Sequence, residues 1–343
     1  MLQLHKSGYG PNRNMEGYRA LRLISRVSND TFSLGLKQEG DMRFALFVCA
    51  ILAGAMLLTV DANAQTSPEW RNCTGNSDVD WDQQIKSCTA LIQSGRETAH
   101  DRAVAYGNRG IAYLAKGDND RAIADYTQAV QLDPKYTVAY INRALAYRAN
   151  GDNDRAIADF TQAIRLDPKF AFAYNNRGSA YYAKGSYDRA IADFSEAIRL
   201  DPKYATYPYN NRGDAYYSKG DYDHAVADFT EAIRLDPKYA FAYNGRGEAY
   251  RANGDYDRAI VDLTEAIRLD PTFAFAYYNR GNAYRVKGDY DRAIADFTEA
   301  IRLDPSSAIA YYNRGLTNRA KGDSAKADAD IAAAIKLNPS LGN

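Results

Sequence analysis

The sequence predicts an all-α fold, a solenoid of stacked helical hairpins. The first observation is a fixed period: a proline follows Leu-Asp or Leu-Asn every 34 or 35 residues, at Pro134, Pro168, Pro202, Pro237, Pro271, Pro305 and Pro339. The second is that most periods carry a near copy of DRAIADFTEAIRLDP (291–305). The third is helical spacing of the apolar residues within each copy. A period of this length indicates stacked supersecondary units, not a single globular core.

The segment before the repeats has a different character. From Met42 it reads MRFALFVCAILAGAMLLTVDANAQ, with Arg43, an apolar run over 44–60, and small residues ending at Ala64 before Gln65. This pattern predicts a secretory signal peptide over 42–64, cleaved between Ala64 and Gln65, and hence a periplasmic protein. Residues 1–41 are then a mis-called start or a disordered extension. The alternative is an uncleaved anchor in the inner membrane, because the apolar run is at the lower limit of a membrane span.

Composition excludes several classes of function. Lys plus Arg equals Asp plus Glu at 43 each, and removal of residues 1–64 leaves 36 basic and 38 acidic residues. We therefore expect no nucleic-acid partner, since phosphate binding needs a basic surface. His5, His100 and His224 are scattered, and the two cysteines beyond the signal form no metal-ligand cluster. We expect no metal, no cofactor and no enzymatic activity, because no catalytic triad pattern or phosphate-binding loop is present.

The first helix of each unit is represented by AFAYNNRGSAYYAKG (171–185). Tyr174, Gly178 and Tyr181 share one face of this helix, and Gly185 is placed to end it. The two helices must approach closely, because a small residue recurs at one position of the first helix: Gly110, Ala144, Gly178, Gly213, Gly247, Gly281 and Gly315.

The second helix is represented by residues 289–305. Its apolar residues form one face, Asp289 is placed to cap its start, and Pro305 ends it. A small residue also recurs on this helix, at Ala122, Ala156, Ala190, Ala225, Ala259, Ala293 and Ala327.

These residues resemble the tetratricopeptide repeat (TPR) family, in its exported bacterial form. The family signature is met as Tyr174, Arg177-Gly178, Tyr181, Ala190-x3-Phe194 and Pro202. Tyrosine replaces the family's tryptophan, and arginine replaces its leucine. The resemblance implies a right-handed solenoid whose first helices line a concave groove. It covers seven repeats, at about 103–136, 137–170, 171–205, 206–239, 240–273, 274–307 and 308–341.

An eighth, degenerate repeat is expected at 65–102 as an N-terminal cap. WDQQIKSCTALIQSG (81–95) aligns with the second helix of the regular units, which puts Cys88 at the phenylalanine position. Cys73 then falls near the close approach of the two helices, so we expect a disulfide between Cys73 and Cys88. The alternative is a reduced pair of small buried residues. The link GRETAHDR (95–102) is expected to be longer than the links between the other units.

An arginine of the first helix and an aspartate of the second recur in all seven units. We predict that they pair along the solenoid, with independent solvated positions as the alternative. The arginines are Arg109, Arg143, Arg177, Arg212, Arg246, Arg280 and Arg314. The aspartates are Asp125, Asp159, Asp193, Asp228, Asp262, Asp296 and Asp330.

The side of the first helices that faces the groove in relatives carries aromatic rings and amides. We predict that these residues bind an extended or helical peptide, with amides bonding its main chain and rings covering its side chains. The alternative is that Phe172, Phe241 and Phe275 only pack against the next repeat. The predicted groove residues are Phe172, Asn175, Asn176, Ser179, Tyr182, Tyr207, Asn210, Asn211, Asp214, Tyr217, Phe241, Asn244, Glu248, Arg251, Phe275, Tyr278, Asn279, Asn282 and Arg285.

Charge along this surface favours a partner with basic and acidic stretches. Asp214 and Glu248 are followed by Arg251, Arg285 and Arg319. The relatives' basic clamp for a terminal carboxylate is not reproduced, so binding of a free C-terminus is not predicted. Pro208 and the extra residue near 203–209 are expected to bend the groove.

We expect a noncatalytic protein–protein interaction scaffold that binds a peptide segment or organises an assembly. Its partner is a protein or peptide, with no stable membrane insertion if the signal is cleaved. The alternative is a membrane-tethered structural or assembly protein. The last repeat carries Asn318 and Ile331 in place of the usual rings and no extra helix follows it, which makes self-association through the C-terminal end an open alternative.

Overall fold

The computed structural model describes residues 67–75 and 79–342, and every regular element in these residues is helical. The predicted signal peptide and its cleavage site, Ala64 and Gln65, lie outside the described residues, as does the predicted extension at 1–41. The chain divides into two compact units, 1–202 and 203–343. The division falls beside the extra residue of the third regular repeat and a short 3₁₀ helix, η2 (Pro202–Tyr204).

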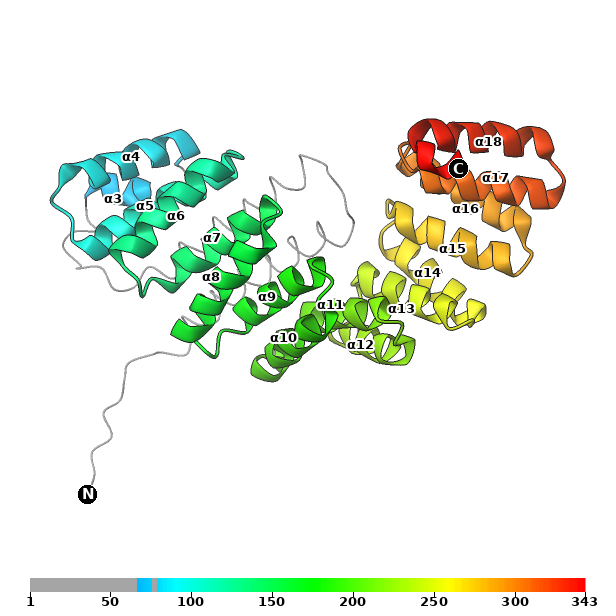
Figure 1. The fold of residues 1–343 in the computed structure, drawn as a ribbon, viewed down its shortest axis with the longest axis horizontal. Helices are drawn as coiled ribbons and strands as arrows, with labels where there is room; N and C mark the ends of the chain where they lie inside the picture. Colours follow the sequence, from blue (N-terminus) through cyan, green and yellow to red (C-terminus); the bar gives the residue numbers. More distant parts are fainter. Residues whose placement is uncertain (1–66, 76–78, 343) are drawn as a thin grey trace, which may run out of the picture. The chain divides into compact units, whose positions relative to one another are not determined.

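Helical hairpins follow one another along the sequence, and the all-α prediction is confirmed (Figure 1). The first helices of the regular hairpins are α5 (Ala99–Ala115), α7 (Thr137–Ala149), α9 (Ala171–Ala183), α11 (Thr206–Ser218), α13 (Ala240–Ala252), α15 (Ala274–Val286) and α17 (Ala308–Lys321). The second helices are α6 (Asn119–Leu132), α8 (Asn153–Leu166), α10 (Tyr187–Leu200), α12 (Tyr222–Leu235), α14 (Tyr256–Leu269), α16 (Tyr290–Leu303) and α18 (Ser324–Leu337). A 3₁₀ turn, η3 (Pro339–Gly342), packs on α18.

Local signals in the sequence set where the second helices begin and end. Asp289 is the N-cap of α16, and its carboxylate accepts a hydrogen bond from the Arg292 backbone N–H. This contact satisfies one of the free donors of the first turn. The turn before α10 contains Gly185 at φ +71°, a left-handed conformation that glycine adopts without steric cost. The helices α10 and α16 end at Leu200 and Leu303, ahead of the prolines.

In four of the seven regular hairpins, a ring of the second helix packs against a glycine of the first; Ala144 replaces the glycine in one hairpin, and Leu263 and Ile331 replace the ring in two others. A Cβ atom added to Gly178 would lie 2.8 Å from the Phe194 ring, and one added to Gly281 would lie 2.9 Å from Phe297. Phe194 and Phe297 are fully buried. The absence of a side chain at these glycines therefore sets the distance between the paired helices.

The predicted arginine–aspartate pairs form in all seven regular repeats. In the second regular repeat, Arg143 donates from Nε to Asp159 at 2.7 Å and from Nη2 at 2.8 Å. Its Nη1 also donates to the Thr127 hydroxyl, 3.1 Å away on the second helix of the preceding repeat. One arginine thus connects its own hairpin to the one before it.

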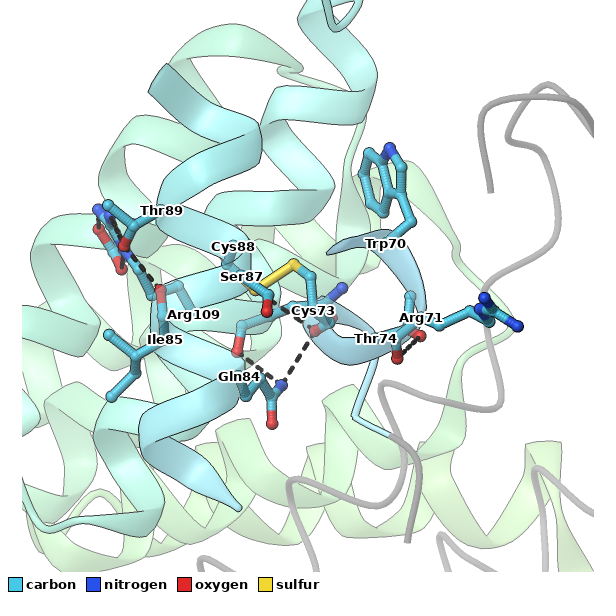
Figure 2. Close-up of a disulfide and its surroundings, with 12 residues drawn as sticks. Trp70, Arg71, Cys73, Thr74, Gln84, Ile85, Ser87, Cys88, Thr89 and Arg109 are labelled. Carbon is cyan, nitrogen blue, oxygen red and sulfur yellow. Dashed lines mark hydrogen bonds and ion pairs between the residues drawn. A yellow bond between two sulfur atoms is a disulfide. The ribbon is translucent and has the colours of Figure 1, made fainter. Parts of the chain in front are cut away.

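The N-terminal cap consists of α3 (Pro68–Cys73) and α4 (Trp81–Ser94), and a disulfide joins Cys73 to Cys88 (Figure 2). Gln84 lies beside the disulfide, and its side-chain amide donates to the carbonyls of Cys73 and Asn108, each at 3.2 Å. The second of these acceptors lies on α5, so the cap is bonded to the first regular repeat as well as to itself.

The predicted long link after the cap is wrong. Thr98 caps α5, which begins at Ala99 and so includes residues 99–102, the second half of the predicted link. Residues 95–98 alone connect α4 to α5, the same length as 133–136 between α6 and α7. Thr98 accepts from the Asp101 backbone N–H, a capping signal that precedes the repeat consensus by one helical turn.

No helix within the described residues is both long enough and apolar enough to cross a lipid bilayer.

Candidate peptide-binding groove

The predicted groove residues lie on α9 in the first unit and on α11, α13 and α15 in the second. Within the second unit, α11 contacts α13, α13 contacts α15, and α15 contacts α17. The first helices of successive hairpins therefore form a continuous layer in that unit. We call its predicted ligand-facing residues the second-unit groove, and we call those of α9 the first-unit patch.

The first-unit patch has one well-exposed ring. Tyr182 is 36% exposed, and its ring centroid lies 5.5 Å from that of Tyr187. Phe172 is half-buried and packs against Phe170, with centroids 5.8 Å apart. Ser179 is half-buried, and its hydroxyl donates to the Asn175 carbonyl at 3.0 Å. Tyr182 is thus the side chain of this patch most open to a partner.

The prediction that the amides of α9 face a ligand is wrong for Asn175 and Asn176, which are 4% and 1% exposed. The Asn176 side chain donates to the Phe172 carbonyl at 2.9 Å, and its Oδ1 accepts from Arg148 Nη1 at 2.8 Å. Arg148 is itself buried on α7. A buried cation must be hydrogen-bonded, and this requirement draws the amide inward.

Some of the aromatic side chains predicted in the second-unit groove pack inside the protein, as the alternative interpretation predicted. Tyr207 is 6% exposed and lies edge-on to Tyr239, with centroids 5.3 Å apart. Phe241 is half-buried between Tyr239 and Phe273, with centroids at 5.6 Å and 4.8 Å. Its prediction as a free docking ring is therefore corrected: it packs between the residues that precede two successive first helices, α13 and α15.

Other apolar side chains on the first helices of the second unit remain open. Phe275 of α15 and Ile309 of α17 are each 44% exposed, and they occupy the same position of successive first helices. Val286, at the end of α15, is 49% exposed. These side chains provide the apolar surface that a partner can cover.

Most amides predicted in the second-unit groove are buried. Asn210, Asn279 and Asn282 are 3%, 2% and 9% exposed. Asn279 donates to Asn244 Oδ1 at 3.0 Å across the α13–α15 contact. The Asn279 amide thus joins neighbouring first helices, and Asn210 bonds Asp214 on its own helix. The prediction that these amides bond a ligand's main chain is corrected for the buried Asn210, Asn279 and Asn282. Asn211, Asp214, Tyr217, Asn244, Glu248, Arg251, Tyr278 and Arg285 are half-buried.

The acidic residues of the second-unit groove lie in an environment that opposes their ionisation. Burial, with a smaller contribution from the charge of Glu248, raises the pKa of Asp214 to about 8. Burial also raises the pKa of Glu248 above its usual value. Arg251 Nη2 lies 3.9 Å from Glu248 Oε1, too far for a strong hydrogen bond.

No group of three or more His, Cys, Asp or Glu side chains able to hold a metal ion is found within 67–75 and 79–342.

Sequence profiles identify the repeat. Profiles described as tetratricopeptide repeat match residues 103–136, 141–205, 274–307 and 308–341, and one described as TPR repeat matches 213–254 and 247–285. The chain belongs to the tetratricopeptide repeat family. Its repeats thus have the predicted helical-hairpin design.

Solved tetratricopeptide repeat structures have the same fold. A tetratricopeptide repeat protein from Parabacteroides merdae ATCC 43184 is 22% identical, with a TM-score of 0.56 over 69% of this chain and 92% of that one. PilF of Pseudomonas aeruginosa is 19% identical, with a TM-score of 0.55 over 65% of this chain and all of that one. Likeness at these identities establishes the fold alone. No curated protein matches this chain.

Sequence reasoning missed Arg148, which occupies the position of Arg251 and Arg285 in an earlier tetratricopeptide repeat. Alignment of the repeats by position was sufficient to find it. Reasoning also missed Asn313, whose amide donates to the Tyr278 hydroxyl at 3.0 Å between α17 and α15. It missed the threonine acceptors such as Thr127 as well, although threonine recurs beside the paired aspartate in most second helices.

Proposed function

We propose that this chain is a noncatalytic scaffold that binds a peptide segment of a partner protein on its first helices. The tetratricopeptide repeat fold is typically a noncatalytic scaffold, which supports this proposal. The partner contacts Phe275, Val286 and Ile309 on the first helices of the second unit, and the half-buried polar residues of the second-unit groove set its register.

The main support for this proposal is the position of the exposed apolar side chains. Among the described residues, the exposed large apolar side chains on first helices are Tyr182, Phe275, Val286 and Ile309. Those on second helices are Val261 and Leu337. Phe275 and Ile309 lie on helices in contact, so they form one apolar strip. In relatives, the first helices line the ligand groove. An exposed apolar strip on these helices therefore favours docking of a partner at this surface.

A peptide-selection experiment tests this proposal. The full chain is screened against displayed random peptides, and each selected peptide is measured against Phe275→Ser plus Ile309→Ser by fluorescence anisotropy. The matched control is Val261→Ser plus Leu337→Ser, which removes exposed apolar side chains from second helices. The groove variant is expected to lose at least tenfold in affinity while the control keeps it. Equal affinity for both variants contradicts the proposal.

We further propose that the protein acts in the periplasm. The support is the signal-like segment at 42–64 and a cystine in the cap, a bond that persists in oxidising compartments. N-terminal sequencing of the protein recovered from a periplasmic extract tests this. A chain that begins at Gln65 agrees with export, and one that retains residues 44–60 in the membrane fraction favours the membrane-tethered alternative.

A further inference from the structure

The last regular repeat lacks a ring that the six preceding repeats share. Their first helices carry a tyrosine where the last carries Asn318. Asn318 lines an open pocket of about 900 Å³ formed by α16, α17 and α18, within the usual range of ligand pockets, about 300–1,000 Å³. We call it the C-terminal pocket. The six tyrosines are Tyr113, Tyr147, Tyr181, Tyr216, Tyr250 and Tyr284.

The preceding repeat shows what surrounds such a ring. Tyr284 is 9% exposed, and the guanidinium carbons of Arg280 and Arg292 lie 6.0 and 4.4 Å from its ring centroid. Ile260, on the second helix of the repeat before it, packs against the same apolar cluster. Tyr147 has the same two kinds of neighbour, with guanidinium carbons at 5.9 and 4.5 Å. The repeat thus forms a site for a phenol ring between two cations and an isoleucine.

The C-terminal pocket keeps the neighbours of that ring. Its walls include Ile294, Arg314 and Lys326. Each of the three stands 34 residues after its counterpart around Tyr284, with lysine in place of arginine at 326. Lys326 Nζ lies 2.8 Å from Asp323 Oδ2, and the equivalent arginine of α16 pairs in the same way with its N-cap aspartate. Two cations and an apolar side chain therefore line the place that a tyrosine fills elsewhere in this chain.

The position of this repeat at the end of the array does not explain the loss of the ring. Terminal repeats of solenoids are commonly atypical because their outer face meets solvent. The contacts of Tyr284, however, are with its own hairpin and with α14 before it. The last repeat has both kinds of neighbour, since α17 packs against α18 and α16. Asn318 is 5% exposed and its amide donates to Asp330 at 3.1 Å, which holds this shorter side chain against α18.

The chemistry of the walls favours a neutral aromatic ligand. Arg314 and Lys326 are each already paired with an aspartate, so a charged group gains little from either cation. A ring can lie beside both without breaking these pairs, as Tyr284 does in the preceding repeat. A cation within about 6 Å of a ring centroid is attracted to the ring face, and Ile294 offers apolar contact.

We propose that the C-terminal pocket binds a tyrosine side chain of a partner protein, with its ring between Arg314 and Lys326 and against Ile294. Tyrosine is the ring that all six equivalent sites of this chain hold. The pocket goes beyond the proposed peptide groove, because α16 and α18 are second helices and its lining shares no residue with the second-unit groove.

The test follows the isoleucine methyl signals of the full chain by NMR as N-acetyl-tyrosine amide is added. This capped amino acid represents a tyrosine within a polypeptide. The ring current of a bound phenol shifts nearby methyl protons, so the Ile294 signal, assigned with Ile294→Val, should move and saturate. The affinity should exceed that of N-acetyl-leucine amide about threefold or more, because leucine gains no attraction from the two cations.

Three variants locate the site. Asn318→Tyr restores the ring from within the chain, so it should raise the melting temperature and abolish the Ile294 shift. Asn318→Ala is the matched control, because it changes the same residue and leaves the pocket open, and it should keep the shift. Tyr284→Asn should open an equivalent pocket one repeat earlier, so that the Ile260 signal responds as well. Circular dichroism checks that each variant is folded.

The outcomes separate the possible occupants. No Ile294 shift in the wild type overturns the proposal, as does a shift that survives Asn318→Tyr. A response to p-cresol without one to N-acetyl-tyrosine amide also overturns it and indicates a small aromatic ligand. A wild-type dimer that Asn318→Tyr dissociates, measured by sedimentation, overturns a separate partner and indicates a second copy of this chain. Phe275→Ser plus Ile309→Ser should leave the Ile294 shift intact, so this proposal and the peptide groove are tested independently.

Discussion

Arg177 and Asp193 form a two-point hydrogen-bonded ion pair between the helices of one hairpin. Arg177 Nε and Nη2 each donate to a different oxygen of Asp193 at 2.8 Å, and the side chains are 17% and 9% exposed. The remaining Nη1 donates to the Thr161 hydroxyl of the preceding hairpin at 3.1 Å. The guanidinium also lies 5.6 Å from the Tyr174 ring centroid. Arginine at this position thus couples neighbouring repeats by polar contacts, where the family's leucine does so by apolar packing.

Loss of this aspartate should be costly. Asp193→Ala leaves a largely buried guanidinium without its carboxylate, so the free energy of unfolding should fall by about 3 kcal/mol. Chemical denaturation followed by circular dichroism measures the change. Glu196→Ala, which breaks the exposed pair with Arg199 on the same helix, should cost less than about 1 kcal/mol. Similar losses for the two variants would show that burial does not strengthen the Arg177 pair.

Removal of the cap disulfide should destabilise the N-terminal end alone. The bond closes a segment with a sequence separation of 15 residues, and Cys73→Ser plus Cys88→Ser should cost about 3 kcal/mol locally. α3 has six residues and cannot persist without the bond. Hydrogen exchange should show lost protection in α3 and α4 with unchanged protection in α15–α18, because each repeat contacts only its neighbours. Uniform loss along the chain would contradict this.

The stability of the second unit should depend on pH through Asp214. Its pKa is raised to about 8 from 3.8, so the folded state holds the proton more tightly than the unfolded state. Stability from this group is present below pH 4 and is lost as pH rises to about 8. The melting temperature of the wild type should therefore fall more between pH 5 and pH 8 than that of Asp214→Asn. Parallel changes in the two proteins would exclude Asp214 as the source.

Substitution of two phenylalanines of the second-unit groove should distinguish a packing role from a peptide-binding role. Phe241→Ala opens a gap between Tyr239 and Phe273 and should lower the free energy of unfolding by about 2 kcal/mol or more. Phe275→Ala removes a ring that is 44% exposed and should cost under about 1 kcal/mol. Peptide affinity, measured on folded protein, should fall for Phe275→Ala. Equal destabilisation by the two substitutions would contradict the assigned roles.

The fold and its ion pairs could be predicted from the sequence because the same helical hairpin, with the same arginine and aspartate positions, recurs in every regular unit. A position that carries arginine in seven units, with aspartate 16 residues later, has the same neighbours in every unit, so one expected contact predicts all seven. Repeat alignment likewise placed Cys88 on the second helix of the cap, and the structure bonds it to Cys73. Departures from the consensus were harder to interpret: the capping signal at Thr98 added a turn to α5 that the repeat alignment did not anticipate.

The sequence by itself determined the helical hairpins, their order and the residues at their closest approach, because these depend on short-range spacing and on the size of single side chains. Only the tertiary structure decided which of the predicted groove residues are open. Asn176 faces inward because the buried guanidinium of Arg148 requires its amide, and Phe241 is enclosed by Tyr239 and Phe273, the residues that directly precede α13 and α15. Such enclosure depends on side chains about 30 residues apart in the sequence, whose contact is set by how successive hairpins stack.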